Sequence, residues 1–338
     1  PRVSPTRPRV RFTGRAVVLA VGAGLLAGCA QLPVVAVPVA GGQIPLVVQP
    51  AQAERIVAVA TTVLGATDPA TIDLGVLATR VAGPELDYRS AARTAASAGA
   101  VLPGTGGADD LEPLTSLLPR QERWPRWFMT VTQPGSDRAP SVVVLRSASA
   151  REPYRIWATP TLLPGQALPA LVAPAEGVAV VTPDEDTNLP MTPVEVADRY
   201  ADVLTTGDRS AYAGQFGTDA YRSDVSASSM REREALTAAG GSLLQEHTLL
   251  PGSVIAARTR DGGALVVAGY RWSSTAAGPP GALAGRLEAP LAALAGRPDA
   301  RRAVVVREEV VVFAVSPGDK GTIDVLATQS GVVSVEAS

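Results

Sequence analysis

The spacing of apolar and polar residues predicts three helices followed by strands in the first half of the chain. Apolar residues recur at helical spacing from Ala51 to Leu64, and Gly65 stands where that helix would end. Two shorter helices follow, the second of them after Gly83-Pro84. The predicted helices are 51–64, 69–77 and 85–97. Beyond them the helical period gives way to alternation, which predicts antiparallel strands at 127–131, 141–147 and 154–159.

The same order of elements recurs after an acidic, proline-rich stretch from Pro183 to Pro193. Thr192-Pro193 is typical of a helix start, and Asp208 and Asp219 are placed to cap two more helices. The predicted helices are 193–206, 208–216 and 219–239. The predicted strands are 243–249, 253–259, 264–273, 303–315 and 322–335. The segment 278–298 is either a long loop or a loop with a short helix at 287–295.

We therefore predict an α+β protein with two tandem, similar domains, each made of three helices followed by a curved antiparallel sheet. A long helix laid across such a sheet gives each domain the shape of a cone. The expected segments are a signal peptide at 1–29, a flexible tether at 30–50, a first domain at 51–182, an acidic linker at 183–192 and a second domain at 191–338.

The first 29 residues have the three parts of a secretory signal: a basic lead, an apolar run from Ala16 and a small-residue exit. The apolar run is too short to span a membrane, which needs about 20 apolar residues. A retained anchor and cytosolic residence are the alternatives. The exit, Leu26, Ala27, Gly28 and Cys29, resembles the lipobox of bacterial lipoproteins. That resemblance implies that Cys29 is the first mature residue and carries two or more acyl chains, such as palmitate, on the extracytoplasmic face of the cell membrane.

Composition narrows the remaining function classes. The formal net charge of −2 gives no electrostatic support for nucleic-acid binding. Cys29 is the only cysteine, so neither disulfides nor thiolate zinc sites are available. Nearly all basic residues are arginine, with Lys320 as the one lysine, and this bias suggests a GC-rich, actinobacterial genome.

No catalytic, metal-binding or cofactor-binding residue is assigned from the sequence. His247 is the only histidine and lies in a predicted strand, where a core or solvent-facing role is the simpler interpretation. Lys320 lies in a turn. The acidic clusters do not have the spacing of a calcium loop and are interpreted as solvated. These clusters are Asp184, Glu185 and Asp186, and Asp109, Asp110 and Glu112.

Aromatic residues are scarce, at 4% of the chain, yet five of them, including Phe128, gather in or beside the first predicted sheet. The four candidate contact residues are Trp124, Trp127, Tyr154 and Trp157. Aromatic side chains serve contact surfaces and cores alike. We predict a contact surface for a partner or a small apolar ligand here, with core packing as the alternative.

Two further stretches carry a family resemblance: the run from Arg80 to Leu86, with the strand around Trp157, and the run from Asp219 to Arg222. Together with the repeated helix-then-sheet order, they resemble an actinobacterial lipoprotein family of unknown function with two nuclear transport factor two-like domains. The resemblance implies no catalytic residue. We expect a non-catalytic binding or scaffolding lipoprotein of the cell envelope; the alternatives are an accessory subunit of an envelope complex and a cell-envelope hydrolase.

Overall fold

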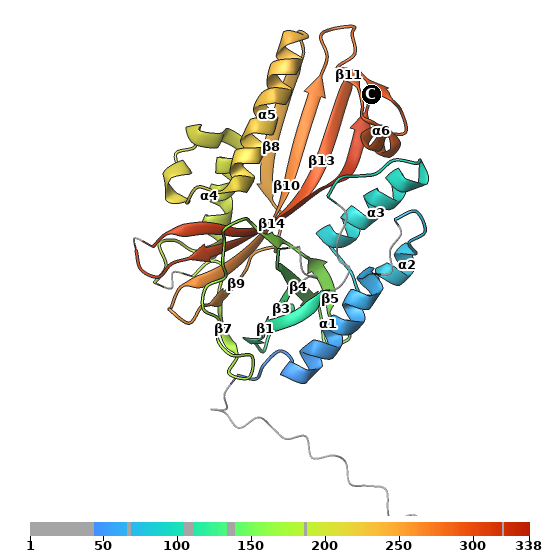
Figure 1. Cartoon of the computed structure of the whole chain (residues 1–338). Coiled ribbons are helices and arrows are strands. Elements are labelled where there is room, and N and C mark those ends of the chain that lie inside the picture. Colours follow the sequence, from blue (N-terminus) through green and yellow to red (C-terminus); the bar gives the residue numbers. More distant parts are fainter. Residues whose placement is uncertain (1–43, 66–68, 105–110, 134–138, 186–187, 320) are drawn as a thin grey trace, which may run out of the picture. The chain divides into compact units, whose positions relative to one another are not determined.

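The fold is α+β, with helices packed against one large, curved and mostly antiparallel sheet (Figure 1). The computed structural model describes residues 44–65, 69–104, 111–133, 139–185, 188–319 and 321–338. The helices of these residues are α1 (Pro50–Gly65), α2 (Leu74–Leu77), α3 (Pro84–Ser97), α4 (Pro193–Thr206), α5 (Ala220–Ala238) and α6 (Ala289–Ala295). No helix among them is both long enough and apolar enough to cross a membrane.

The helix predictions are confirmed except around the shorter elements. Thr192 and Glu195 form the capping box that starts α4, and the Asp219 side chain caps α5. The second helix is shorter than expected, because it is capped by Asp73 rather than by Asp68, which lies outside the described residues. The predicted helix 208–216 forms two 3-10 turns instead, and the short helix expected within 278–298 is α6.

The strands include every predicted one and several that the sequence pattern did not reveal. They are β1 (Glu112–Leu117), β2 (Pro119–Arg120), β3 (Arg126–Gln133), β4 (Ser141–Ser147), β5 (Arg155–Ala158), β6 (Thr161–Leu162), β7 (Val178–Val181), β8 (Ser242–Leu249), β9 (Ile255–Arg258), β10 (Ala264–Ala277), β11 (Gly285–Arg286), β12 (Asp299–Ala300), β13 (Arg302–Val315) and β14 (Ile323–Ala337). The strands that escaped prediction in the first half are β1, β2, β6 and β7; apart from β1, they are short.

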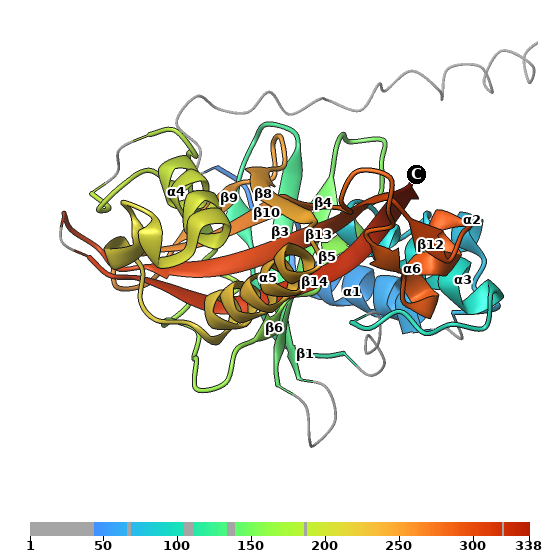
Figure 2. The same cartoon turned by 90° about the horizontal axis from the view of Figure 1, so that it is seen from above.

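Twelve of the described strands form one sheet, in the order β1-β3-β4-β6-β14-β13-β10-β9-β7-β2, with β5 beside β4 and β8 beside β10. The two outer strands, β1 and β2, are separated in sequence by Leu118 alone, so the curved sheet nearly closes on itself. Helices α4 and α5 pack against β8, α3 and α6 pack against β14, and α1 contacts β1 (Figures 1 and 2).

The division into two tandem domains is not confirmed, because strands of the two halves pair with each other. β6 pairs with β14, and β7 pairs with β9. Alternate residues of β10 and β13 point to opposite faces of the sheet. Val266 and Phe313 face the core under α4, whereas Val267 and Val312 pack against strands of the first half. Residues Ile44–Ser338 accordingly form one compact unit.

Trp157 lies where the two halves meet, and two glycines make room for it. A Cβ atom at Gly83 would lie 2.5 Å from the indole, and one at Gly269 would lie 2.9 Å from it. Gly83 also has φ of 59°, which favours glycine, so the turn before Pro84 can start α3 against this ring. The stretch from Arg80 to Leu86 therefore has a packing role in joining the halves.

The boundaries expected for the tether and the linker also differ from the structure. Val47 and Val48, expected in the flexible tether, are buried, and the Val47 amide donates to the Pro119 carbonyl. Leu189, expected in the solvated linker, packs in the core beneath α4, whereas Asp184 and Glu185 are exposed as predicted.

Candidate functional site

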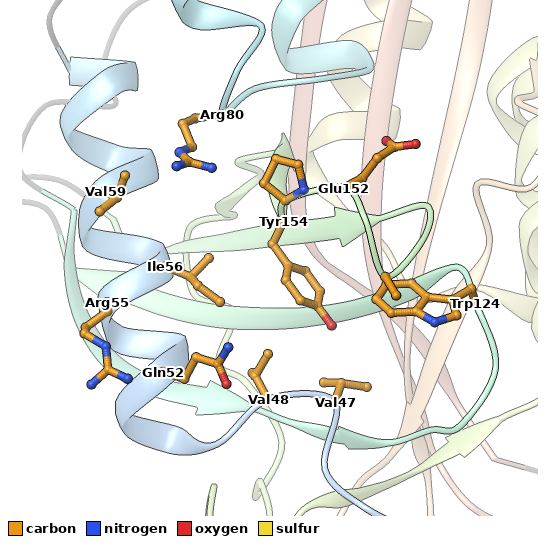
Figure 3. Close-up of a pocket in the computed structure, with 12 residues that line it drawn as sticks. Val47, Val48, Gln52, Arg55, Ile56, Val59, Arg80, Trp124, Glu152 and Tyr154 are labelled. Carbon is orange, nitrogen blue, oxygen red and sulfur yellow. The ribbon is translucent and has the colours of Figure 1, made fainter. Parts of the chain in front are cut away.

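A groove lies between α1 and the loops that precede β3 and β5, and we call it the α1 groove. Its volume is about 610 Å³, within the usual range of small-molecule sites. Figure 3 shows its lining side chains, which converge from the start of the chain's described part, from α1 and from the loops. The lining residues are Val47, Val48, Gln52, Arg55, Ile56, Val59, Arg80, Trp124, Ala150, Glu152, Pro153 and Tyr154.

The groove exists because only one face of α1 packs into the core. Ala53, Val57 and other residues at helical spacing are fully buried, and this fixes the helix on the first-half strands. The adjoining face carries Ile56, which is half-buried, and Val59, which is 48% exposed. These apolar side chains form one wall of the groove.

Tyr154 occupies the floor of the groove (Figure 3). Its ring packs edge-on against Phe128, with 5.1 Å between ring centroids. Its hydroxyl oxygen is buried and has no hydrogen-bond partner among the described residues. Burial raises the pKa of Tyr154 to about 12, partly offset by the nearby Arg126 guanidinium. The hydroxyl therefore keeps its proton at neutral pH.

Trp124 forms the opposite wall and is held in place from behind. The Arg126 guanidinium lies over its ring, 4.7 Å from the centroid, while the same guanidinium donates to the Glu122 carbonyl at 2.9 Å. The Gln121 amide donates to the Pro125 carbonyl at 3.0 Å. The indole is 36% exposed, so one side of it remains accessible from the groove.

The charges around the groove are unbalanced. Glu152 is paired with Arg155 at 3.0 Å, so its charge is compensated outside the groove. Arg55 and Arg80 make no ion pair with any described residue. Arg80 is half-buried and lies at the end of the groove between α1 and the segment carrying Glu152 (Figure 3). The site therefore presents apolar walls and an excess of positive charge.

Of the four aromatic residues predicted as a contact surface, only Trp124 and Tyr154 line the groove. Trp127 and Trp157 are 4% and 9% exposed and belong to the core that joins the halves. For those two, core packing was the right interpretation: Trp127 lies on β3 between β1 and β4, and Trp157 packs against Gly83 and Gly269.

A second group of polar side chains is enclosed between the second-half strands and α5. His247, Trp272 and Arg307 are direct neighbours on β8, β10 and β13. The His247 and Trp272 rings stack with 5.1 Å between centroids, and the Arg307 guanidinium lies 4.5 Å from the Trp272 centroid. Glu309 accepts from the Tyr221 hydroxyl of α5. We call these five residues the polar cluster.

Hydrogen bonds define the tautomer of His247. The Thr205 hydroxyl donates to the Ala201 carbonyl at 2.9 Å, so its oxygen must accept from the His247 backbone N–H at 2.9 Å and from Nδ1 at 3.2 Å. The proton is therefore on Nδ1, and Nε2 carries a lone pair. Nε2 lies 3.5 Å from Oε2 of Glu309, and neither atom has a hydrogen-bond partner among the described residues.

Burial keeps both members of this pair neutral. It raises the pKa of Glu309 to about 7, against the lowering effects of the Tyr221 hydrogen bond and the Arg307 charge. Burial and the Arg307 charge lower the pKa of His247 to about 3. Between these values a protonated carboxyl faces an unprotonated imidazole nitrogen. Both side chains are at most 1% exposed, so the pair does not contact solvent.

Sequence reasoning missed Glu309, although the sequence carries a signal for it. Glu308 and Glu309 interrupt an otherwise apolar strand, and a charged residue in the middle of a buried strand is rarely placed there without a partner. The groove had no comparable signal, because its walls come from segments that are distant in sequence.

Of the remaining sequence candidates that the structure describes, Glu112, Asp184 and Glu185 belong to neither site. The lipobox residues Leu26, Ala27, Gly28 and Cys29, and also Lys320, Asp109, Asp110 and Asp186, lie outside the described residues. Among the residues that are described, no group of three or more histidine, cysteine, aspartate or glutamate side chains is placed to hold a metal ion.

Comparison with protein families matches residues 47–337 to a family described as a domain of unknown function, DUF8094. Searches among curated proteins and among solved structures found no match. The matched segment contains all residues of the α1 groove and of the polar cluster. Because the match covers most of the chain, this protein belongs to the DUF8094 family of uncharacterised domains.

Proposed function

We propose that this protein is a lipid-anchored, extracytoplasmic binding or scaffolding protein of the cell envelope, with the α1 groove as its contact site. The observation that carries the proposal is the groove itself: an apolar-walled site of about 610 Å³ with an accessible indole and an unpartnered tyrosine hydroxyl. A site with apolar walls and a few polar groups is typical of ligand binding.

The N-terminal sequence supports the membrane attachment. A lipid on Cys29 would hold the chain at a membrane, and two acyl chains make such an anchor stable. Val47 is 18 positions after Cys29, so even a fully extended connection keeps the groove within about 65 Å of the anchor. The groove would therefore work close to the membrane surface.

The non-catalytic part of the proposal is supported by the enclosure of the polar cluster. His247 and Glu309 are the ionisable pair best suited to acid–base chemistry, yet their side chains are 1% and 0% exposed. A substrate would have no contact with them in this conformation. A role as an accessory subunit of an envelope complex is the second candidate, favoured by the exposed apolar Val59 and Trp124 on opposite walls of the groove.

The recurrence of helices followed by strands in each half supports a finer proposal about the fold. We infer that the two halves, α1 to β7 and α4 to β14, descend from a duplicated nuclear transport factor two-like unit. Shared strand pairing would then be a later adaptation that merged two cones into one sheet.

Two experiments test the proposed function. Intact-mass spectrometry of protein taken from bacterial membranes should find acyl chains on Cys29, and C29S should abolish them; a mature chain without acyl mass would contradict the anchor. For the groove, V59D and V76D form a matched pair, because both valines are exposed on helices but only Val59 lines the groove. Molecules that co-purify with the wild type and V76D but not with V59D would support the contact site, and identical profiles would contradict it.

A further inference from the structure

We propose that the α1 groove binds a single-chain anionic amphiphile, with its apolar tail along α1 and its anionic head at Arg80. This inference rests on the proposed function and specifies the chemistry of the ligand. It depends on two features of the described residues: the apolar wall and the uncompensated cations.

The uncompensated positive charges of the groove favour an anionic ligand. Arg55 and Arg80 are both without an ion-pair partner among the described residues, whereas the one lining carboxylate, Glu152, is already paired with Arg155. Arg80 is half-buried at the groove's end, where a guanidinium forms stronger and less screened contacts than on an open surface. Arg55 is exposed on α1 and adds to the local positive field.

The apolar walls of the groove favour a ligand with an acyl chain. Ile56 and Val59 on α1 lie across the groove from Trp124, with the Tyr154 ring between them (Figure 3). Val48 and Pro153 complete the apolar lining. Each methylene that these side chains remove from water contributes about 0.8 kcal/mol. A small free anion would gain none of this, so the head alone should bind poorly.

The test uses the purified full chain and oleate as the probe, followed by isothermal titration calorimetry and by the fluorescence of Trp124. Oleamide, which has the same tail and a neutral head, and acetate, which has the head alone, are the chemical controls. Oleate should bind more tightly than oleamide, and acetate should not bind measurably. W124F should abolish the fluorescence change while the calorimetric signal persists.

Variants divide the contributions of head and tail. R80Q should weaken oleate binding roughly tenfold, as expected for one lost charge-assisted hydrogen bond, and should leave oleamide binding unchanged. R55Q should have a smaller effect in the same direction. R231Q removes an exposed arginine of α5 far from the groove lining and should have none. V59D should abolish binding, whereas V76D should preserve it.

Several outcomes would overturn the inference. Equal affinities for oleate and oleamide, or an R80Q chain that binds oleate like the wild type, would exclude an anionic head at Arg80. Binding to phosphatidylglycerol vesicles without binding of monomeric oleate would assign the charge to membrane contact instead. If oleate does not bind while a V59D-sensitive molecule co-purifies from membranes, this inference fails and the binding function remains; if neither is seen, both fail.

Discussion

Two buried glutamates, Glu85 and Glu309, are used in opposite ways by the same fold. Glu85 of α3 is 2% exposed and fully partnered: it accepts from Arg89 at 3.0 Å, from the Thr159 hydroxyl at 2.9 Å and from the Gln329 amide at 2.7 Å. Glu309 of β13 is fully buried, yet one of its oxygens lacks any hydrogen-bond partner among the described residues.

The two glutamates differ in how well the protein replaces the hydration that each carboxyl group loses on burial. Around Glu85, a cation and two neutral donors replace the lost hydration, and the network connects α3 with the loop after β5 and with β14. Around Glu309 there is too little compensation, so the proton stays on the carboxyl and the pKa rises to about 7. Glu85 therefore joins the two halves, whereas Glu309 responds to pH.

The largest effect should come from E85Q, which removes the anion beside Arg89. Arg89 is 7% exposed and would be left as a buried charge without a partner. Breaking a buried pair in this way costs about 3–5 kcal/mol. Urea unfolding at pH 7, followed by circular dichroism, should show this loss. E54Q, an exposed residue of α1, should change stability by less than about 0.5 kcal/mol. A loss below about 1 kcal/mol for E85Q would mean that the network does not join the halves.

The second prediction concerns pH. The folded-state pKa of Glu309, about 7, lies above its ordinary value of 4.5, so its contribution to stability is complete below pH 4.5 and is lost as pH rises through 7. E309Q lacks this contribution. The difference in unfolding free energy between wild type and E309Q should therefore shrink between pH 4.5 and 8, by on the order of 3 kcal/mol. A difference that is constant with pH would contradict a neutral Glu309.

H247Q should show the opposite sign. Burial lowers the folded-state pKa of His247 to about 3, below its ordinary 6.5, so its contribution is present above pH 6.5 and is lost as pH falls toward 3. The stability difference between wild type and H247Q should therefore decrease as pH falls over that range. The two trends oppose each other between pH 4.5 and 6.5, so the summed contribution of Glu309 and His247 to stability should change little there. Urea unfolding at half-unit pH steps measures all three chains.

Sequence patterns predicted most of the elements but not how they are shared between the halves. Helical spacing and caps located α1, α3, α4 and α5 because these features are local. The sequence of β13 does indicate that the halves share a core. Its apolar residues run almost continuously on both sides of the Arg307-Glu308-Glu309 interruption. Strands covered on both faces have such runs, whereas strands with one solvated face alternate. The second cover of β13 comes from the first half.

The sites were predictable only in part, for a related reason. Trp124 and Tyr154, which line the α1 groove, were predicted as contact residues because aromatic residues are scarce in this chain. Composition could not distinguish them from Trp127 and Trp157, which belong to the core. Only the three-dimensional structure shows that the Trp157 indole packs against Gly83, whereas the Trp124 indole packs against the Arg126 guanidinium. Likewise, His247 is paired with Glu309, which is 62 positions away along the chain, so no local sequence pattern could indicate the pair.

The smallest predicted effect tests what sets the pKa of Glu309. The Tyr221 hydroxyl donates to Glu309 and lowers this pKa, opposing the larger raising effect of burial. Y221F should therefore raise the pKa further, at a cost in stability of about 1 kcal/mol for the lost hydrogen bond.

The pH at which the stabilising effect of Glu309 is lost should move upward in Y221F, measured as the difference between Y221F and Y221F/E309Q in urea unfolding. Y270F is the matched control: Tyr270 is also buried on this face of the sheet, but its hydroxyl donates to the Ala197 carbonyl at 3.1 Å. Y270F should lower stability by a similar amount without moving this pH. A shift to lower pH in Y221F would show that the tyrosine stabilises the protonated carboxyl instead. The difference between Glu85 and Glu309 would then be caused by the hydrogen-bond donors around each carboxyl group and not by the desolvation of Glu309.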